Sequence, residues 1–335
     1  MLKKYITNLY GQSESSTAML AQNTVTKIAE NDGYSEIRIQ AYPVQESDTE
    51  VEKEKRIEGI LSGIPKESLL IVQLPTWNGI AFDEVFLKKA REKTNHLVIF
   101  IHDFVPLMFV NNEYLFERYL LAYNFADLVI VPSKKMEEIL RGRGLNTVTI
   151  IQSIWDHIVS LQLDHYPQFY RKIKFIGNSS RFPFVGNWKS DLELEVFSQG
   201  NIKADGFLTL RGWLPDDQLL RELNRGGFGL VWSENIENQY EREYSEMNVS
   251  HKFSTYLAAG LPIIVNKGLA KEEFVRKYCL GLVVENLEEA VNHVKTMTPR
   301  EYQAYITNVR KVSYLIKEGY FTKQLLLDIQ KELFL

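Results

Sequence analysis

The chain has 335 residues, 45% hydrophobic and 24% charged, which is the composition of a folded globular protein of about two domains. This composition excludes a disordered, collagenous or low-complexity chain. The 39 basic and 43 acidic residues give a net charge of −4, so neither a nucleic acid nor an anionic membrane is an expected partner.

Cysteine content and hydropathy indicate the compartment. The single cysteine, Cys279, cannot close a disulfide within the chain, and no secretory signal pattern is present at the N-terminus. The longest apolar runs, 97–101 and 261–265, are strand-sized and far shorter than the ~20 residues of a membrane-spanning helix. We therefore expect a cytoplasmic protein with no membrane span.

In the first half of the chain, short apolar runs alternate with segments of helical periodicity. This pattern is typical of a parallel sheet covered by helices. We expect one doubly wound sheet, with strands at 4–9, 36–41, 69–74, 97–102, 128–131 and 147–151 and helices at 17–31, 81–94, 113–125 and 134–141.

A second series begins after a polar stretch at 165–172. Its expected strands are 174–177, 207–211, 228–232, 262–265 and 282–285, and its expected helices are 191–197, 216–224, 252–259, 271–278 and 287–296. Two helical segments, 299–317 and 322–335, end the chain. The fold class is therefore α/β, with Rossmann-like domains at 1–165 and 166–317 and a C-terminal segment at 318–335.

The last helix carries one apolar face, formed by Leu325, Leu326, Ile329 and Leu333. Such a face packs against another element. Because both sheets already have their own helices, we expect this helix to return to the first domain. Use of the same face in a homo-oligomer is the competing interpretation.

Doubly wound domains bind ligands at the carboxyl ends of their strands, so loops that follow strands carry the candidate residues. In the first such loop, Thr17 lies where a helix N-terminus attracts an anion. The loop lacks G-x-G-x-x-G and a Walker lysine, which disfavours an ordinary ATP or NAD loop. The alternative is that a hydroxyl here only caps the helix.

The loop after the first strand of the second domain combines a glycine, small polar residues and a fixed cation. Asn178, Ser179 and Arg181 suit a diphosphate that must be held by forked donors. The alternative is a surface arginine above a polar loop.

The segment 246–265 is expected to contain a short helix capped by Asn248 or Ser250 and a buried strand. Lys252 falls in the first turn of that helix, where a lysine opposes the helix dipole unless an anion is bound. We therefore predict a phosphate contact for Lys252. For Tyr256, packing in the core is the alternative to a place in the site.

Three residues are candidate general bases: His102 and Asp103, which end a buried strand, and His157, which follows Trp155-Asp156. The sequence does not choose among them, and a hydrogen-bonded core position is the alternative for His102. Trp77, Asn78 and Pro106 follow strands of the first domain and are candidates for an acceptor wall, with packing as the alternative. No Asp-x-Asp element is present, and no His or Cys spacing comes with a partner set of ligands, so we expect no metal.

The run from His251 to Pro262 resembles the donor-site signature of GT-B glycosyltransferases, and 209–214 resembles the GT-B loop whose backbone meets the nucleotide base. Residues 5–9 with Gly11, and then 75–78, 106–109, 155–157 and 181–183, are similar to the glucosyltransferase 3 family. That family extends O-linked glycans on serine-rich-repeat adhesins of streptococci and lactobacilli.

The resemblance implies a GT-B fold and transfer of glucose from UDP-glucose to N-acetylglucosamine on an adhesin, without cofactor or metal. It implies that Arg181 and Lys252 meet the UDP phosphates and that Thr17 approaches the donor. The remaining donor-binding residues that it implies are Arg211, Gly212, Trp213, Asn248, Val249, Ser250 and His251.

Where many GT-B members place a glutamate that holds the ribose, this chain has Thr255, so the resemblance does not explain how the ribose is held. Two other functions stay open. One is a nucleotide-sugar epimerase, and the other is an inactive GT-B subunit that binds glycopeptide.

Overall fold

Each half of the chain folds around one parallel six-stranded sheet, as the alternation of strands and helices predicts. The computed structural model describes residues 2–42, 44, 47–159, 161–163, 166–179, 181–198, 206–233 and 238–335. Two compact units result, Met1–Ser153 with Thr322–Leu335, and Ile154–Phe321. The second unit begins earlier than residue 166, because the indole of Trp155 donates to the Val249 carbonyl at 2.8 Å.

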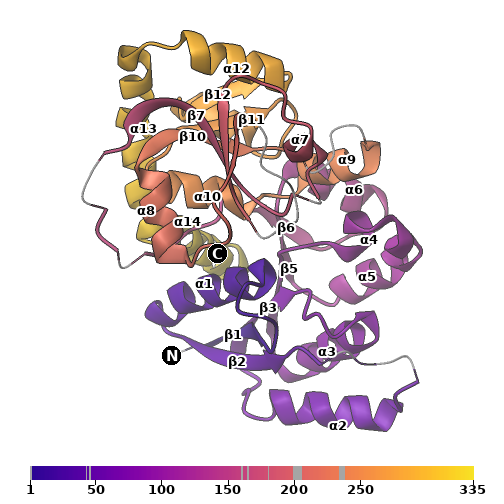
Figure 1. Ribbon diagram of the computed structural model, residues 1–335. Helices are drawn as coiled ribbons and strands as arrows, with labels where there is room; N and C mark the ends of the chain where they lie inside the picture. The colour runs from indigo at the N-terminus through magenta and orange to yellow at the C-terminus, as the bar shows by residue number, and fades with distance from the viewer. Residues whose placement is uncertain are drawn as a thin grey trace. The chain divides into compact units, whose positions relative to one another are not determined.

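The first unit has the strand order β2-β1-β3-β4-β5-β6 (Figure 1). Its strands are β1 (Lys3–Tyr10), β2 (Tyr34–Gln40), β3 (Ser68–Leu74), β4 (His96–Ile101), β5 (Leu128–Val131) and β6 (Val148–Ile151). Its helices are α1 (Thr17–Asn31), α2 (Glu50–Leu61), α3 (Ile80–Lys93), α4 (Val105–Met108), the 3-10 helix η1 (Val110–Leu115), α5 (Phe116–Tyr123) and α6 (Lys134–Gly142). Every residue of β3 is buried, as expected for a strand covered on both faces.

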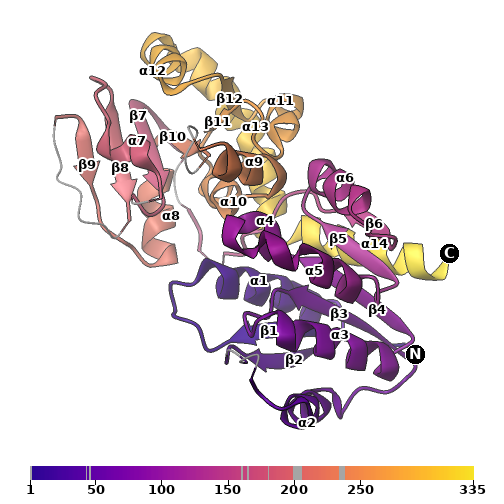
Figure 2. The same ribbon diagram turned by 90° about the vertical axis from the view of Figure 1, so that its right-hand side faces the viewer.

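The C-terminal helix α14 (Tyr320–Phe334) returns to the first unit from Thr322 onward (Figure 2). Leu325, Leu326 and Ile329 of its apolar face are buried. Near its end, the Phe334 ring meets His96 of β4 edge to face, with ring centroids 4.8 Å apart. No helix in the described residues has the length and apolar character needed to cross a membrane.

The second unit has the strand order β12-β11-β10-β7-β8-β9. Its strands are β7 (Gln168–Ile176), β8 (Glu193–Phe197), β9 (Leu208–Leu210), β10 (Gly226–Val231), β11 (Ile263–Asn266) and β12 (Gly281–Val284). Its helices are α7 (Pro183–Gly186), α8 (Asp216–Asn224), α9 (Gln239–Met247), α10 (His251–Ala258), α11 (Glu272–Tyr278), α12 (Leu287–Thr296) and α13 (Pro299–Lys317).

The helix expected at 191–197 is wrong, because this segment forms strand β8. Its residues alternate, with Leu194 and Val196 in the hydrophobic core and Glu193 and Glu195 on the opposite face. The two glutamates pair with Lys172 of β7, at 3.2 and 3.0 Å. A period of two residues is the pattern of a strand, and here it is short enough to be mistaken for part of a helix.

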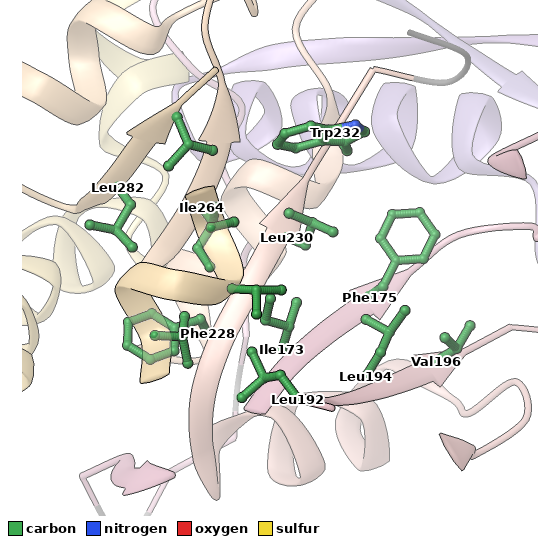
Figure 3. Close-up of a cluster of buried hydrophobic side chains, with 14 of the residues drawn as sticks. Ile173, Phe175, Leu192, Leu194, Val196, Phe228, Leu230, Trp232, Ile264 and Leu282 are labelled. Carbon is green, nitrogen blue, oxygen red and sulfur yellow. The ribbon is translucent and has the colours of Figure 1, made fainter. Parts of the chain in front are cut away.

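Apolar side chains cover both faces of the second sheet. On one face, Phe175, Leu194, Leu230 and Ile264 lie among the buried side chains that strands β7, β8, β10 and β11 contribute (Figure 3). On the other face, α10 packs its Tyr256 ring directly over Gly229 of β10. This close approach requires a residue without a side chain at position 229.

The strand orders place the switch points of the two sheets. In the first sheet the winding reverses between β1 and β3, and in the second between β7 and β10. Doubly wound sheets bind their ligands outside the carboxyl ends of the strands at such points. The loop after β7 therefore begins the candidate site of the second unit.

We predict that Gly229→Ala destabilises the second unit by about 1–3 kcal/mol, because overpacking strains a filled core. The added Cβ would lie 2.3 Å from the Tyr256 ring. Denaturant unfolding measures the change. Gly59→Ala is the control, since Gly59 lies in α2 with no atom within 4 Å of its new Cβ, and it should stabilise by about 0.5–1 kcal/mol. Equal effects of the two substitutions would contradict the packing argument.

Candidate functional site

Lys252 lies against the loop that follows β7. A Cβ added to Gly177 would be 2.9 Å from the Lys252 Cε atom. The Lys252 ammonium is 4.6 Å from the centroid of the Phe182 ring, and Phe182 directly follows Arg181. The two cations predicted to meet a diphosphate therefore belong to one small region, although they are far apart in the sequence.

Helix α10 holds Lys252 in this position. Ser250 caps the helix and accepts the backbone N–H of Lys252 at 3.3 Å. Deeper in the same helix, the buried hydroxyl of Tyr256 accepts the backbone N–H of Ile176, the last residue of β7, at 2.8 Å. Tyr256 thus packs in the core, which was the alternative to a place in the site. Its hydrogen bond fixes α10 beside the Gly177 loop.

The residues before Lys252 form a tightly packed turn. The Trp155 ring stacks on His251, with centroids 4.5 Å apart and an interplanar angle of 19°. Desolvation, together with Coulombic repulsion from His157 and Lys252, lowers the pKa of His251 to about 3. His251 is therefore neutral at physiological pH and adds no second positive charge beside Lys252.

His157 links two helices of the second unit. Its Nε2 lies 3.1 Å from Asp216 Oδ2 at the start of α8, and its Nδ1 lies 3.3 Å from Thr255 Oγ1 in α10. The Thr255 hydroxyl also donates to the His251 carbonyl at 3.1 Å. The hydroxyl that stands in place of the GT-B glutamate is thus bonded inside the protein. A general-base role for His157 stays a prediction.

The other residues of the predicted donor set lie in the Gly177 loop, just before α10 and after β9. Asn178 is exposed and Ser179 buried in the Gly177 loop, while Asn248 accepts the backbone N–H of Val249 at 3.0 Å. Arg211, Gly212 and Trp213 follow β9, which lies beyond β8 at the edge of the sheet. Gly212 has a positive φ of 77°, and Trp213 is 49% exposed.

Arg211 turns its guanidinium toward the sheet rather than toward the Gly177 loop. It donates to the Glu195 carboxylate at 2.7 Å. The resemblance places the backbone of this loop at the nucleotide base, and the side chain of Arg211 is not needed for that contact.

In the first unit, His102 has a buried, hydrogen-bonded position. Its Nε2 lies 2.8 Å from Oε1 of Gln73, whose amide in turn donates to Thr26 at 2.9 Å. This is the core position given as the alternative for His102, and its catalytic role stays a prediction. Asp103, the next residue, is partly buried.

The loop after β3 carries Trp77 and Asn78. Asn78 is buried and accepts the backbone N–H of Tyr42 at 2.6 Å, so it shapes the loop. Trp77 has a left-handed φ of 59°, and its buried indole N–H meets no acceptor in the described part of the chain. Strained backbone and an unpaired donor are typical of a binding site.

The remaining candidates of the first unit are Thr17 and Pro106. Thr17 is exposed as the first residue of α1, while Ser16 caps that helix by accepting the Met19 N–H at 3.2 Å. Pro106 is buried within α4. Among the residues that the structure describes, no three His, Cys, Asp or Glu side chains are grouped to hold a metal ion.

Comparison with known proteins matches both units to one family. A model described as glucosyltransferase 3-like, N-terminal domain, matches residues 3–154, and the corresponding C-terminal domain matches residues 173–329. Glucosyltransferase 3 of Streptococcus gordonii is 44% identical over 335 residues, covering 99% of each chain. Glucosyltransferase 3 of Streptococcus parasanguinis is 41% identical and covers 98% of each. The chain belongs to the glucosyltransferase 3-like family.

Solved structures share the fold of this glucosyltransferase 3-like protein. Sucrose-phosphate synthase from Thermosynechococcus elongatus has a TM-score of 0.66 at 12% identity and covers 100% of this chain and 99% of its own. Anabaena HepE, solved with UDP and glucose, has a TM-score of 0.68 at 9% identity and covers 99% of this chain and 100% of its own. These likenesses concern the fold alone, and they confirm the predicted α/β class and GT-B architecture.

The family also decides the enzyme class. The resemblance to glucosyltransferase 3 is confirmed, and so is the prediction of a UDP-sugar-dependent hexosyltransferase. The roles of individual residues stay predictions.

Sequence reasoning did not single out Lys271, at the carboxyl edge of the second sheet after β11. Its φ is 69°, and burial lowers the pKa of its ammonium to about 8. Periodicity alone does not show which lysines are buried.

We predict that His251 makes the second unit less stable as the pH falls. Unfolded histidine has a pKa of about 6.5 and binds a proton below it, whereas folded His251 stays neutral, so unfolding takes up a proton. The free energy of unfolding should therefore fall from pH 6.5 toward pH 4, by at most about 1.4 kcal/mol per pH unit.

His251→Phe keeps the ring that stacks on Trp155 and should flatten this slope. Denaturant unfolding between pH 4 and pH 7 measures it for both proteins. Identical slopes would show that the folded imidazole is not held neutral.

Proposed function

We propose that the protein transfers glucose from UDP-glucose to N-acetylglucosamine that is O-linked to a serine-rich-repeat adhesin. The observation that carries the proposal is the position of Lys252 against the Gly177 loop. Two relatives that span nearly the whole chain are named glucosyltransferase 3, which supports glucose as the transferred sugar. The adhesin acceptor follows from the family resemblance.

The chemistry asks for positive charge at the leaving group. As the bond between the anomeric carbon and the phosphate oxygen breaks, charge develops on the departing diphosphate, and fixed cations and helix dipoles stabilise it. In the proposal, Arg181, Lys252 and the N-terminus of α10 perform this role without a metal ion. Lys252 lies in the first turn of α10, where its charge opposes the helix dipole, so a bound anion is favourable there.

The acceptor hydroxyl forms the new bond to the anomeric carbon and loses its proton to a base. His102, Asp103 and His157 remain the proposed candidates for this base. We further propose that the loop with Trp77 contacts the acceptor, because an unpaired buried N–H and an aromatic ring suit a sugar.

We also propose a cytoplasmic homo-oligomer. The single cysteine supports a reducing compartment. Leu327 and Phe334 on α14 are 56% and 45% exposed, which supports association through this helix.

We predict that Lys252→Ala and Arg181→Ala each weaken UDP binding about ten- to a hundredfold, because each removes a charge-assisted hydrogen bond worth roughly 1.5–3 kcal/mol. Isothermal titration with UDP measures the change. Thermal unfolding should stay near that of the parent, and Lys311→Ala on the exposed face of α13 is the matched control. A variant that binds UDP like the parent loses its assigned role.

We predict glucose transfer to a peptide carrying N-acetylglucosamine on serine, with undiminished rate in excess chelator. Mass spectrometry of the peptide and of the nucleotide sugar gives the readout. Strict dependence on Mn²⁺ would refute the metal-free mechanism. Interconversion of free nucleotide sugar would indicate an epimerase instead, and binding of the peptide without turnover would indicate an inactive subunit.

A further inference from the structure

A second cavity of the same unit is lined by charged residues at the amino half of β7, away from the Gly177 loop at its carboxyl end. Its volume is about 600 Å³. Strands β7, β8 and β9 lie side by side here (Figure 2). The side chains that carry the argument are Lys172, Lys174, Glu195, Arg211, Arg221 and Arg225.

Positive charge dominates this cavity. Five of its lining residues are lysine or arginine, whereas only Glu195 and Glu222 are acidic. Glu195 is 3% exposed and is shared by three cations, at 3.0 Å from Lys172, 2.7 Å from Arg211 and 3.7 Å from Lys174. Burial alone would raise the pKa of the Glu195 carboxyl, but hydrogen bonds from Arg211 and Lys172 lower it.

Lys174 is the most deeply buried of the three cations that share Glu195. It is 2% exposed, and its ammonium donates to the backbone carbonyl of Glu222 near the end of α8. Burial outweighs the attraction of Glu195 and lowers the pKa of Lys174 to about 8. A buried ammonium with a depressed pKa gains stability when a further negative charge comes near.

Arg221 adds a cation that the fold does not use. It is exposed on α8, lines the cavity, and makes no ion pair within the described residues. Arg225, by contrast, pairs with Glu222 at 2.8 Å. Tyr166 and Tyr170 line the same cavity and are about half exposed, at 54% and 48%.

We propose that this cavity is a second ligand site, which binds a phosphate-bearing anion of two or more negative charges. The excess of fixed cations over carboxylates selects an anion, and guanidinium groups match phosphate oxygens with forked donors. A cavity of about 600 Å³ lies in the size range of small-molecule sites. The site uses neither Lys252 nor Arg181, so it does not depend on the proposed function.

Titration of the full chain with pyrophosphate tests the site by calorimetry. The parent should show two classes of pyrophosphate sites, one at the Gly177 loop and one at this cavity. Arg221→Glu should weaken the cavity class at least about tenfold, since it replaces attraction by repulsion. Arg300→Glu, the same change at an exposed position of α13, should leave both classes unchanged.

Lys252→Ala separates the two sites. It should weaken only the class at the Gly177 loop, so failure of the proposed donor site and failure of this inference give different results. In Lys252→Ala, displacement of pyrophosphate from the cavity by UDP would identify a nucleotide as the source of the phosphate. Failure of UDP to displace it would identify free phosphate or pyrophosphate as the ligand. Lys174→Met replaces the ammonium by an apolar side chain of similar length and should abolish pyrophosphate binding at the cavity.

A single class of pyrophosphate sites that Lys252→Ala abolishes would overturn the inference. Unchanged affinity in Arg221→Glu would overturn it as well, and this exposed position does not put folding at risk. Binding of an acidic peptide without binding of pyrophosphate would show a protein-docking surface instead.

Discussion

The hydrogen bond between the Ile176 N–H and the Tyr256 hydroxyl joins β7 to α10, and the candidate site depends on it. The Tyr256 side chain is fully buried, so loss of the Ile176 N–H would leave its hydroxyl unpaired at a cost of about 1–3 kcal/mol. Gly229 leaves room for the Tyr256 ring beneath it. This bond ties α10 to the end of β7, which brings the N-terminus of the helix, with Lys252, beside the Gly177 loop.

The cations of the second unit differ in the groups that surround their charge. Lys252 opposes the dipole of α10 and lies over the Phe182 ring, while its neighbour His251 stays neutral beneath Trp155. Three other cations share the buried carboxylate of Glu195. The three cations around Glu195 outnumber the carboxylate that they share, and such local positive charge favours the binding of anions.

Much of the fold was predictable because parallel strands are apolar runs and helices between them are amphipathic. All six strands of the first sheet, α10 and the returning α14 follow from such patterns. Strand β8 was missed because its two-residue period is short, and its glutamates find their cations, Lys172 of β7 and Arg211 after β9, only in the folded sheet. Helix α2 was missed because of its few apolar residues, and no element was predicted where α9 lies. Within the site, the sequence pointed to Lys252 and Arg181, but the partners of His102, His157 and Arg211 arise from tertiary contacts that no local pattern contains.

The two units differ in the number of chain segments that build them. The first unit is made of two separate stretches, since α14 rejoins it after the whole second unit has been traversed. The second unit is thus topologically an insertion into the first, and it is one unbroken stretch. Replacing it by the corresponding stretch of a relative would exchange the whole second sheet and its helices as a single segment, whereas the first unit needs both Met1–Ser153 and Thr322–Leu335.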